Sequence, residues 1–383
     1  MNSIRAAWLR IHSGLFPFLE EHLRGELTPK LRQVVCVLEV LHIEDFTVPA
    51  WHQWMGRRRA DRDAIARTFV AKAVLDLPTT EALVDLLQRD CVLRDICGWE
   101  YAGKVPSSST FSRAFAEFTQ QGLGNAVLEA MVREHVGEAV VHHVSRDSMA
   151  INVRERVAKK SKSTGQDEAL ENPQALEKPK EKPKENTKKK RGRPKKGEVR
   201  KAPDLTRLQK QVGQTAEEAL AELPTAIDFG CKTDANGKTS FWKGVKVHVD
   251  WADGSIPLNA VTTSASMHDS QAAIPMMKQT SQRAISLYDE MDSAYDANLI
   301  HQVSRGLGHV PIIDIHPRRT TAAPFDPPTV ERYKNRTAAE RGNARLKDEF
   351  GGRHVRVRGP KVHTHLMFGL LALFADQMLK LFT

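Results

Sequence analysis

The stretch YKNRTAAERGNARLK, residues 333–347, has the composition of a helix but is charged where a core helix would be apolar. Its alanines and its leucine favour helix, and one glycine opposes it. At about 3.6 residues per turn, Tyr333, Arg336, Glu340 and Lys347 fall within a stripe about 60° wide. A stripe that faces a core should be apolar. This one is charged, so we expect it to face water or a charged partner.

The composition indicates a globular protein with an anionic partner. The chain has 383 residues, which is enough for two or three domains, and a hydrophobic fraction of 40%. The formal net charge of +10 suggests nucleic acid first and a membrane surface second, against the alternative that the charge only serves solubility. The longest apolar run, 366–375, is too short to span a bilayer. We therefore expect nucleic acid as the partner and no membrane.

The cysteines and histidines indicate neither a zinc site nor a disulfide framework. The four cysteines include no C-x-x-C pair, and scattered thiols suit a reducing cytoplasm. Arginines interrupt any apolar run at the amino terminus, so no signal peptide is expected. His142 with His143, and His363 with His365, fit no common metal-ligand spacing. We expect these four to be structural histidines.

Residues 1–135 are predicted to form an all-α N-terminal domain that binds DNA. Leucines recur at helical spacing in 79–99, and three phenylalanines make a buried face in 105–118. Ser112 and Arg113 would lie on the outer face of that second helix. Two helices joined by a turn with Gly and Pro can form a helix-turn-helix that reads a major groove. Small helical bundles look the same, so both interpretations stay open.

Residues 155–205 differ sharply from the rest of the chain. The segment is rich in Lys, Glu and Pro and lacks aromatic residues, so we expect a disordered linker. Its part 188–201 holds nine lysines and arginines against one glutamate, a local net charge of +8. Within it, Arg191 and Arg193 flank a glycine and precede a proline, which resembles the core of an AT-hook in an A·T minor groove. The alternative is a solvated lysine-rich spacer.

Residues 136–383 are predicted to form a second, catalytic domain of α/β order, interrupted by this linker. A strand at 138–151 precedes the linker. Two strands joined by a turn at Asp253 follow it, and then helix, strand, helix, strand and two more helices. This order matches a ribonuclease-H-like fold, a mixed five-stranded sheet flanked by helices.

Three acids are expected to meet at one edge of this sheet. Asp147 lies near the carboxyl end of the first strand, Asp292 follows the next-to-last strand, and Glu340 is on the helix after the last strand. Three unpaired carboxylates repel one another, and divalent metals such as Mg²⁺ or Mn²⁺ resolve the conflict. Two such ions about 4 Å apart can activate an attacking oxygen and stabilise a leaving one in phosphodiester chemistry. The alternative is ordinary surface acids, and Asp289 competes with Asp292 for the middle place.

A family likeness rests on residues at fixed spacing. The spacing in 333–347, with Tyr333, Arg336, Glu340 and Lys347, resembles the Y-x2-R-x3-E-x6-K signature of bacterial insertion-sequence transposases of the DDE class. Three further segments resemble that family: SRDSMAI at 145–151, the run from KGVKV to MHDS at 243–270, and DSAYD at 292–296. The last favours Asp292 as the second acid, with Ala294 where the family has glycine.

The resemblance implies a transposase that cuts DNA at terminal inverted repeats and joins the freed 3′-OH to target DNA. It implies that the three acids hold two Mg²⁺ ions and that Tyr333, Arg336 and Lys347 contact phosphates or flanking bases. We expect double-stranded DNA as the partner, a homodimer in the complex that holds two ends, and a cytoplasmic, nucleoid-associated location. Two alternatives stay open: a metal-dependent nuclease without strand transfer, and a non-catalytic DNA-binding protein derived from a transposase.

Overall fold

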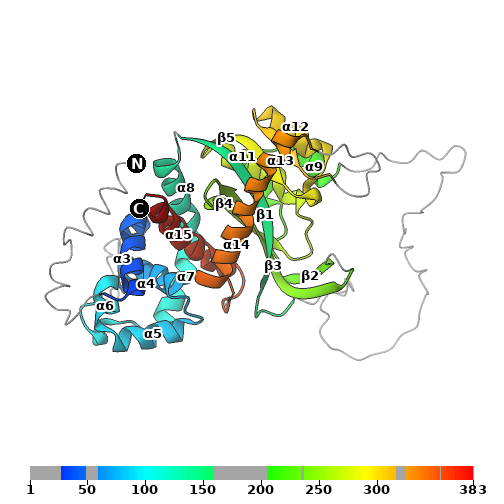
Figure 1. Cartoon of the computed structure of the whole chain (residues 1–383). Helices are drawn as coiled ribbons and strands as arrows, with labels where there is room; N and C mark the ends of the chain where they lie inside the picture. Colours follow the sequence, from blue (N-terminus) through cyan, green and yellow to red (C-terminus); the bar gives the residue numbers. More distant parts are fainter. Residues whose placement is uncertain are drawn as a thin grey trace, which may run out of the picture. The chain divides into compact units, whose positions relative to one another are not determined.

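Figure 1 shows the computed structural model of the chain, which describes residues 27–48, 59–137, 139–157, 205–233, 237–315, 325–353 and 355–382. Its strands are β1 Val140–Asn152, β2 Asp228–Thr233, β3 Thr239–Ala252, β4 Ile256–Ser264, β5 Ile285–Met291 and β6 Val310–Ile313. Its α-helices are α3 Pro29–Leu41, α4 Arg62–Val74, α5 Thr80–Arg89, α6 Cys91–Cys97, α7 Ser108–Gln121, α8 Leu123–His135, α9 Arg207–Gly213, α10 Ala216–Ala221, α11 Ser270–Ser281, α12 Asn298–Gly306, α13 Pro327–Tyr333, α14 Thr337–Glu349 and α15 Lys361–Phe382. Arg191, Arg193 and most of the predicted linker lie outside the described residues.

The sheet is mixed, as predicted, but it has six strands rather than five. Its order is β2-β3-β1-β5-β6, and β4 pairs with β3 in addition. The pairs β1–β5 and β5–β6 are parallel, and the pairs made by β3 are antiparallel. The strand missed is β2, whose sequence DFGCKT is short, contains a glycine and has no run of β-branched or aromatic residues to signal a strand. β1 also continues to Asn152, so Asp147 lies in the middle of its strand and not near the carboxyl end.

The charged stripe is not carried by one continuous helix. Tyr333 ends α13, a 3-10 helix (η5, Lys334–Arg336) follows, and α14 begins at Thr337. A 3-10 turn holds fewer residues per turn than an α-helix. Only Glu340 and Lys347 therefore lie on one α-helical face as predicted, and the predicted alignment of Tyr333 and Arg336 with them is wrong. Tyr333 and Arg336 therefore reach the sheet from a separate short segment.

The glycine that opposes helix formation in this stretch is required by packing. α14 lies against β1 and β3. A Cβ atom on Gly342 would be 2.5 Å from the ring of Trp251, which is fully buried on β3. The loss of helix propensity, about 1 kcal/mol, is therefore offset by close approach of the helix to the sheet. Ala339 and Leu346 bury the same face of α14.

α15 is the central helix of the hydrophobic core. It contacts α3, α4, α7 and α8, and also β4 and α14; Figure 1 shows it between these groups. It is the one helix in the described ranges that is long and apolar enough to span a membrane, and 83% of that stretch is buried inside the protein. The predicted buried face of α7, made by Phe111, Phe115 and Phe118, packs in the same core, where the rings of Phe368 of α15 and Phe115 are in tilted contact. The division into two domains near residue 135 stays a prediction.

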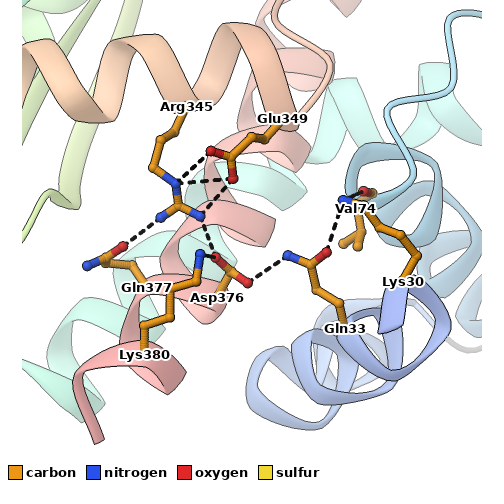
Figure 2. A network of polar contacts seen from close by, with 8 residues as sticks. All are labelled: Lys30, Gln33, Val74, Arg345, Glu349, Asp376, Gln377 and Lys380. Carbon is orange, nitrogen blue, oxygen red and sulfur yellow. Dashed lines mark hydrogen bonds and ion pairs between the residues drawn. The ribbon is translucent and has the colours of Figure 1, made fainter. Parts of the chain in front are cut away.

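A polar network joins α14 to α15 and to the amino-terminal helices (Figure 2). Arg345 of α14 pairs with Asp376 of α15 and donates to Gln377 at 2.6 Å. Asp376 also accepts from Lys380 at 2.8 Å and from Gln33 of α3 at 2.7 Å. Burial by itself would raise the pKa of Asp376, but these hydrogen bonds lower it below its usual value. The network thus stabilises the fold when Asp376 is ionised.

We expect Asp376→Asn to lower stability by about 2 kcal/mol near pH 6, because several charge-assisted hydrogen bonds are lost. A depressed folded-state pKa gives stability that is present above the unfolded-state pKa and lost as pH falls through the folded-state pKa. The gap between wild type and variant should therefore close on acidification toward pH 2. Urea unfolding at several pH values measures it.

The matched control is Asp85→Asn. Asp85 forms an exposed i,i+4 pair with Arg89, with 61% of its side chain accessible, and should change stability by less than about 0.5 kcal/mol. If the difference in free energy of unfolding between wild type and Asp376→Asn does not change with pH, the stabilising role assigned to ionised Asp376 is wrong.

Candidate active site

The pairing of β1 with β5 brings two of the predicted acids together. The two strands are parallel, with Ser145 beside Glu290 and Arg146 beside Met291. Continuing this register by one residue puts Asp147 beside Asp292, on strands about 4.8 Å apart. Asp292 caps the 3-10 helix η4 (Ser293–Tyr295), and its side chain accepts from the backbone N–H of Ala294 at 3.0 Å.

The electrostatics of Asp147 and Asp292 agree with this placement. Burial raises the pKa of Asp147 to about 6; among the charges near it, Arg336 lowers the pKa and Asp292 raises it. Burial also raises the pKa of Asp292, and Arg336 lowers it. A guanidinium therefore lies near both carboxylates. Asp269, at the start of α11, is a further acid close enough to raise both values, and it accepts from Lys246 at 2.8 Å.

Glu340 lies on the first turn of α14 and is paired with Arg336. The Arg336 Nη1 atom donates to Glu340 Oε1 at 2.9 Å, and the Glu340 side chain is 58% exposed. The guanidinium is thus shared among the predicted acids. Asp147 has a second partner on α14, because Asn343 Nδ2 donates to its Oδ2 at 2.8 Å. Asn343 was not singled out by the sequence, where an amide on a helix carries no distinctive signal.

Asp289, the competing middle acid, is directed to the other face of the sheet. It is three residues from Asp292, an odd separation that reverses the face in a strand. Its carboxylate accepts from Ser304 Oγ of α12 at 2.6 Å and lies 3.0 Å from His309 Nδ1. Burial alone would raise the pKa of Asp289, but the bond with His309 and the charge of Arg146 lower it. It is engaged in the core beneath α12.

A buried polar cluster that the sequence did not reveal adjoins the site. Glu290 is fully buried on β5 and accepts from Ser145 Oγ at 3.0 Å. Burial raises the pKa of Glu290 to about 7. The neighbouring His143 lies 3.0 Å from Asp253 and 3.2 Å from the amide of Asn335, the residue before Arg336. This cluster ties η5 to β1 and to the β3–β4 turn, so it holds the segment that carries Arg336.

The other two residues of the signature also border the acids. Tyr333 donates from its hydroxyl to the backbone carbonyl of Met291 at 3.3 Å, and burial raises the pKa of Tyr333 to about 12. Lys347 is half-buried on α14. Burial lowers the pKa of Lys347, as does the charge of Lys232 on β2, while Asp147 opposes this effect. The structure therefore brings Tyr333, Arg336 and Lys347 to the same side of the sheet as Asp147.

The residues predicted to enter a DNA groove lie elsewhere, on α7. Ser112 and Arg113 are exposed, as expected. Arg113 bonds only within its own helix in the described contacts, and Lys361 of α15 donates to the carbonyl of Ser112 at 3.1 Å. His363 and His365 have structural partners, as expected, with His365 3.0 Å from the carbonyl of Gly351; burial lowers the pKa of each to about 4.

The acids suit a divalent cation although they do not form a closed ligand set. Among the described residues, no group of three or more His, Cys, Asp or Glu side chains is close enough to hold a metal ion. Asp147 and Asp292 supply hard oxygen donors, and their mutual repulsion would be relieved by a cation. Glu340 would have to leave its pair with Arg336 to join them.

Two family models match the chain. A model described as Transposase DDE domain matches residues 215–375, and one described as Transposase domain (DUF772) matches residues 19–117. The first range contains Asp292 and the whole charged stripe, and the second contains α3 to α6 and most of α7. Asp147 lies outside both ranges, on the far side of the linker.

Neither curated proteins nor solved structures gave a match. The two family models together cover about two thirds of the chain, and they agree with the signature around Glu340. The chain belongs to the insertion-sequence transposases of the DDE class. A DDE domain implies a ribonuclease-H-like fold, with which the mixed sheet and its flanking helices are consistent, and it implies a DNA-binding enzyme that generally depends on divalent metal.

Proposed function

We propose that the protein cuts DNA at the terminal inverted repeats of its element and joins the freed 3′-OH ends to target DNA. The observation that carries this proposal is the parallel pairing of β1 with β5, whose register brings Asp147 beside Asp292, near the charge of Arg336. Glu340 completes the proposed set from α14, one helical turn from Arg336. Asp292 is preferred to Asp289 because the latter is bonded to Ser304 and His309 on the opposite face.

The three acids are proposed to hold divalent metal, with Mg²⁺ expected and Mn²⁺ as a substitute. When bound, two such ions would activate the attacking oxygen and stabilise the leaving oxygen of the phosphodiester. The protein's own contribution is orientation and charge. Asn343 fixes the carboxylate of Asp147, and Arg336, once released from Glu340, can grip a phosphate with two parallel hydrogen bonds. No side-chain nucleophile is then required.

DNA on both sides of the cut is proposed to follow polar and basic side chains. Tyr333 and Lys347 flank the acids and would contact phosphates or bases of the element end. Ser112 and Arg113 are proposed to contact DNA from α7, and Arg191 and Arg193 from the linker. Two copies of the chain would hold the two ends of one element.

The test uses DNA ends taken from the inverted repeats that flank the gene. Purified protein is incubated with a labelled end duplex and a supercoiled target plasmid, in Mg²⁺, in Mn²⁺ or in EDTA. We expect cleavage at the repeat end and a joined product with either ion, and no reaction in EDTA. Cleavage without a joined product would favour a metal-dependent nuclease. Tight end binding with no cleavage under any condition would favour a non-catalytic DNA-binding protein.

A further inference from the structure

The strand that the sequence did not predict builds a two-stranded ribbon at one end of the sheet. β2 pairs with residues 239–244 of β3, and we call this pair the β2–β3 ribbon. Figure 1 shows it at the end of β3 that lies away from α12. One of its faces is closed by its own packing, because a Cβ atom on Gly230 would be 2.3 Å from the ring of Trp242, its partner across the ribbon.

The other face presents two aromatic rings to solvent. Phe229 pairs with Lys243, and Cys231 pairs with Phe241, so side-chain alternation puts these four residues on one face. Phe229 and Phe241 occupy diagonal positions of that face. Phe229 is 60% exposed, and Phe241 at 75% is the most exposed of the large hydrophobic side chains in the described ranges. Aromatic rings that are exposed in the free protein and become buried when a partner binds are typical of a binding surface.

The charge of the ribbon favours an anionic partner. Lys243 shares the face of the two rings, and Lys232, which pairs with Ser240, belongs to the other face. The one acid of the paired strands, Asp228, is engaged by the backbone N–H of Ser266 at 2.9 Å. Lys232 lies close enough to Lys347 for their charges to interact, and Lys347 interacts in turn with Asp147. Lysine side chains therefore lie both near the acids, where Lys347 is, and on the ribbon.

The position of the ribbon fits the path of DNA beyond the cut. Asp147 pairs with Val249 of β3, eight residues from Phe241. At about 3.3 Å per residue, that is about 26 Å along the strand. This distance is within reach of a strand of DNA that leaves the acids.

We propose that the β2–β3 ribbon binds unpaired nucleotides of the DNA beside the acids, with Phe229 and Phe241 stacked on bases and with Lys243, which shares their face, on a phosphate. The rings carry no donor or acceptor to read base edges, and the faces of duplex bases are covered by their neighbours. Aromatic rings and lysines together are instead the usual platform for single strands, where each base stacks on one ring. This inference rests on the proposed function, since cutting DNA releases a strand end from its duplex.

The test compares a double variant with wild type on two probes. Phe229→Ser combined with Phe241→Ser removes both rings from an exposed face, so the fold should persist, which a thermal melt checks. The probes are a fluorescein-labelled oligo(dT) and a duplex of mixed sequence, each about 20 nucleotides long, measured by anisotropy in EDTA. We expect affinity for oligo(dT) to fall about 10-fold or more, and affinity for the duplex to change less than about 2-fold.

Two controls sharpen the result. Ile285→Ser combined with Leu287→Ser alters an exposed apolar pair on β5 and should leave both affinities unchanged. Lys243→Ala should flatten the salt dependence of oligo(dT) binding by about 0.7 in log–log slope, since each phosphate contact to a single strand contributes about 0.7. Arg305→Ala, an exposed cation on α12, should leave that slope unchanged.

Three outcomes would overturn the ribbon proposal. The first is that the double phenylalanine variant binds oligo(dT) with the same affinity as wild type. The second is that the variant loses as much affinity for the duplex as for oligo(dT). The third is loss of self-association in sedimentation with DNA affinity intact, which would make the surface an interface between two copies. Because binding is measured in EDTA, each outcome stands apart from the proposed function. A wild-type protein that cuts and joins ends while failing these tests loses only the ribbon proposal.

Discussion

Asn in place of Asp147 or Asp292, or Gln in place of Glu340, should slow cleavage of repeat-end DNA by about 1,000-fold or more. Each substitution removes a charged oxygen donor from the proposed metal site, and a loss of about 4 kcal/mol of barrier stabilisation corresponds to that factor. End binding should remain near that of wild type, because none of the acids is proposed to contact DNA directly. Cleavage of a labelled end duplex and a gel-shift titration measure the two effects.

The matched control for these acids is Asp289→Asn. Asp289 is on the same strand as the proposed middle ligand but is bonded to Ser304 and His309. Its substitution should lower thermal stability and leave the rate per folded molecule within about 10-fold of wild type. If Asp292→Asn cuts normally while Asp289→Asn does not, the middle acid has been assigned to the wrong residue.

Lys347→Ala should slow cutting and joining about 100-fold while leaving metal binding intact. Lys347 is half-buried on α14, about 10 Å along the helix from Glu340. It is therefore too distant to share an ion with Glu340 but suitably placed for a neighbouring phosphate, and a misplacement of about 1 Å at the scissile bond can cost a factor of that size. Calorimetry with Mn²⁺ and the end-cleavage assay separate the two effects.

Lys210→Ala is a suitable control for that experiment, because Lys210 is an exposed lysine on α9, away from the charged stripe. It should cut like wild type. Equal cleavage rates for wild type, Lys347→Ala and Lys210→Ala would mean that the stripe on α14 is an ordinary solvated helix face. The signature would then have no functional meaning in this chain.

Local patterns were sufficient to predict most of the strands and the region of the acids. β1, β3, β4, β5 and β6 each carry a β-branched or aromatic run, and the turn at Asp253 separates two of them as predicted. The spacing of the signature located Glu340 on a helix that packs against the sheet. These features depend on neighbours in the sequence, so they can be read without knowing the fold.

The remaining features depend on contacts between distant segments. Glu290 can be buried because Ser145 lies beside it and donates a hydrogen bond to it. The register of β1 and β5 that brings the two together cannot be predicted from the sequence of either strand alone. β2 forms because the start of β3 extends past β4 and offers it a partner. The break at 334–336 likewise reflects tethering of Asn335 to His143, a contact across the fold.

The position of α15 has a consequence for how the protein is made. This helix is the last element that the structure describes, yet it packs against α3, α4, α7 and α8 near the beginning of the chain. During synthesis those helices emerge from the ribosome first. Their apolar faces stay uncovered until the sheet with its acids has been translated and α15 follows. The nascent chain is therefore expected to expose this apolar surface until α15 has been translated, and chaperones that act at the ribosome are expected to bind it.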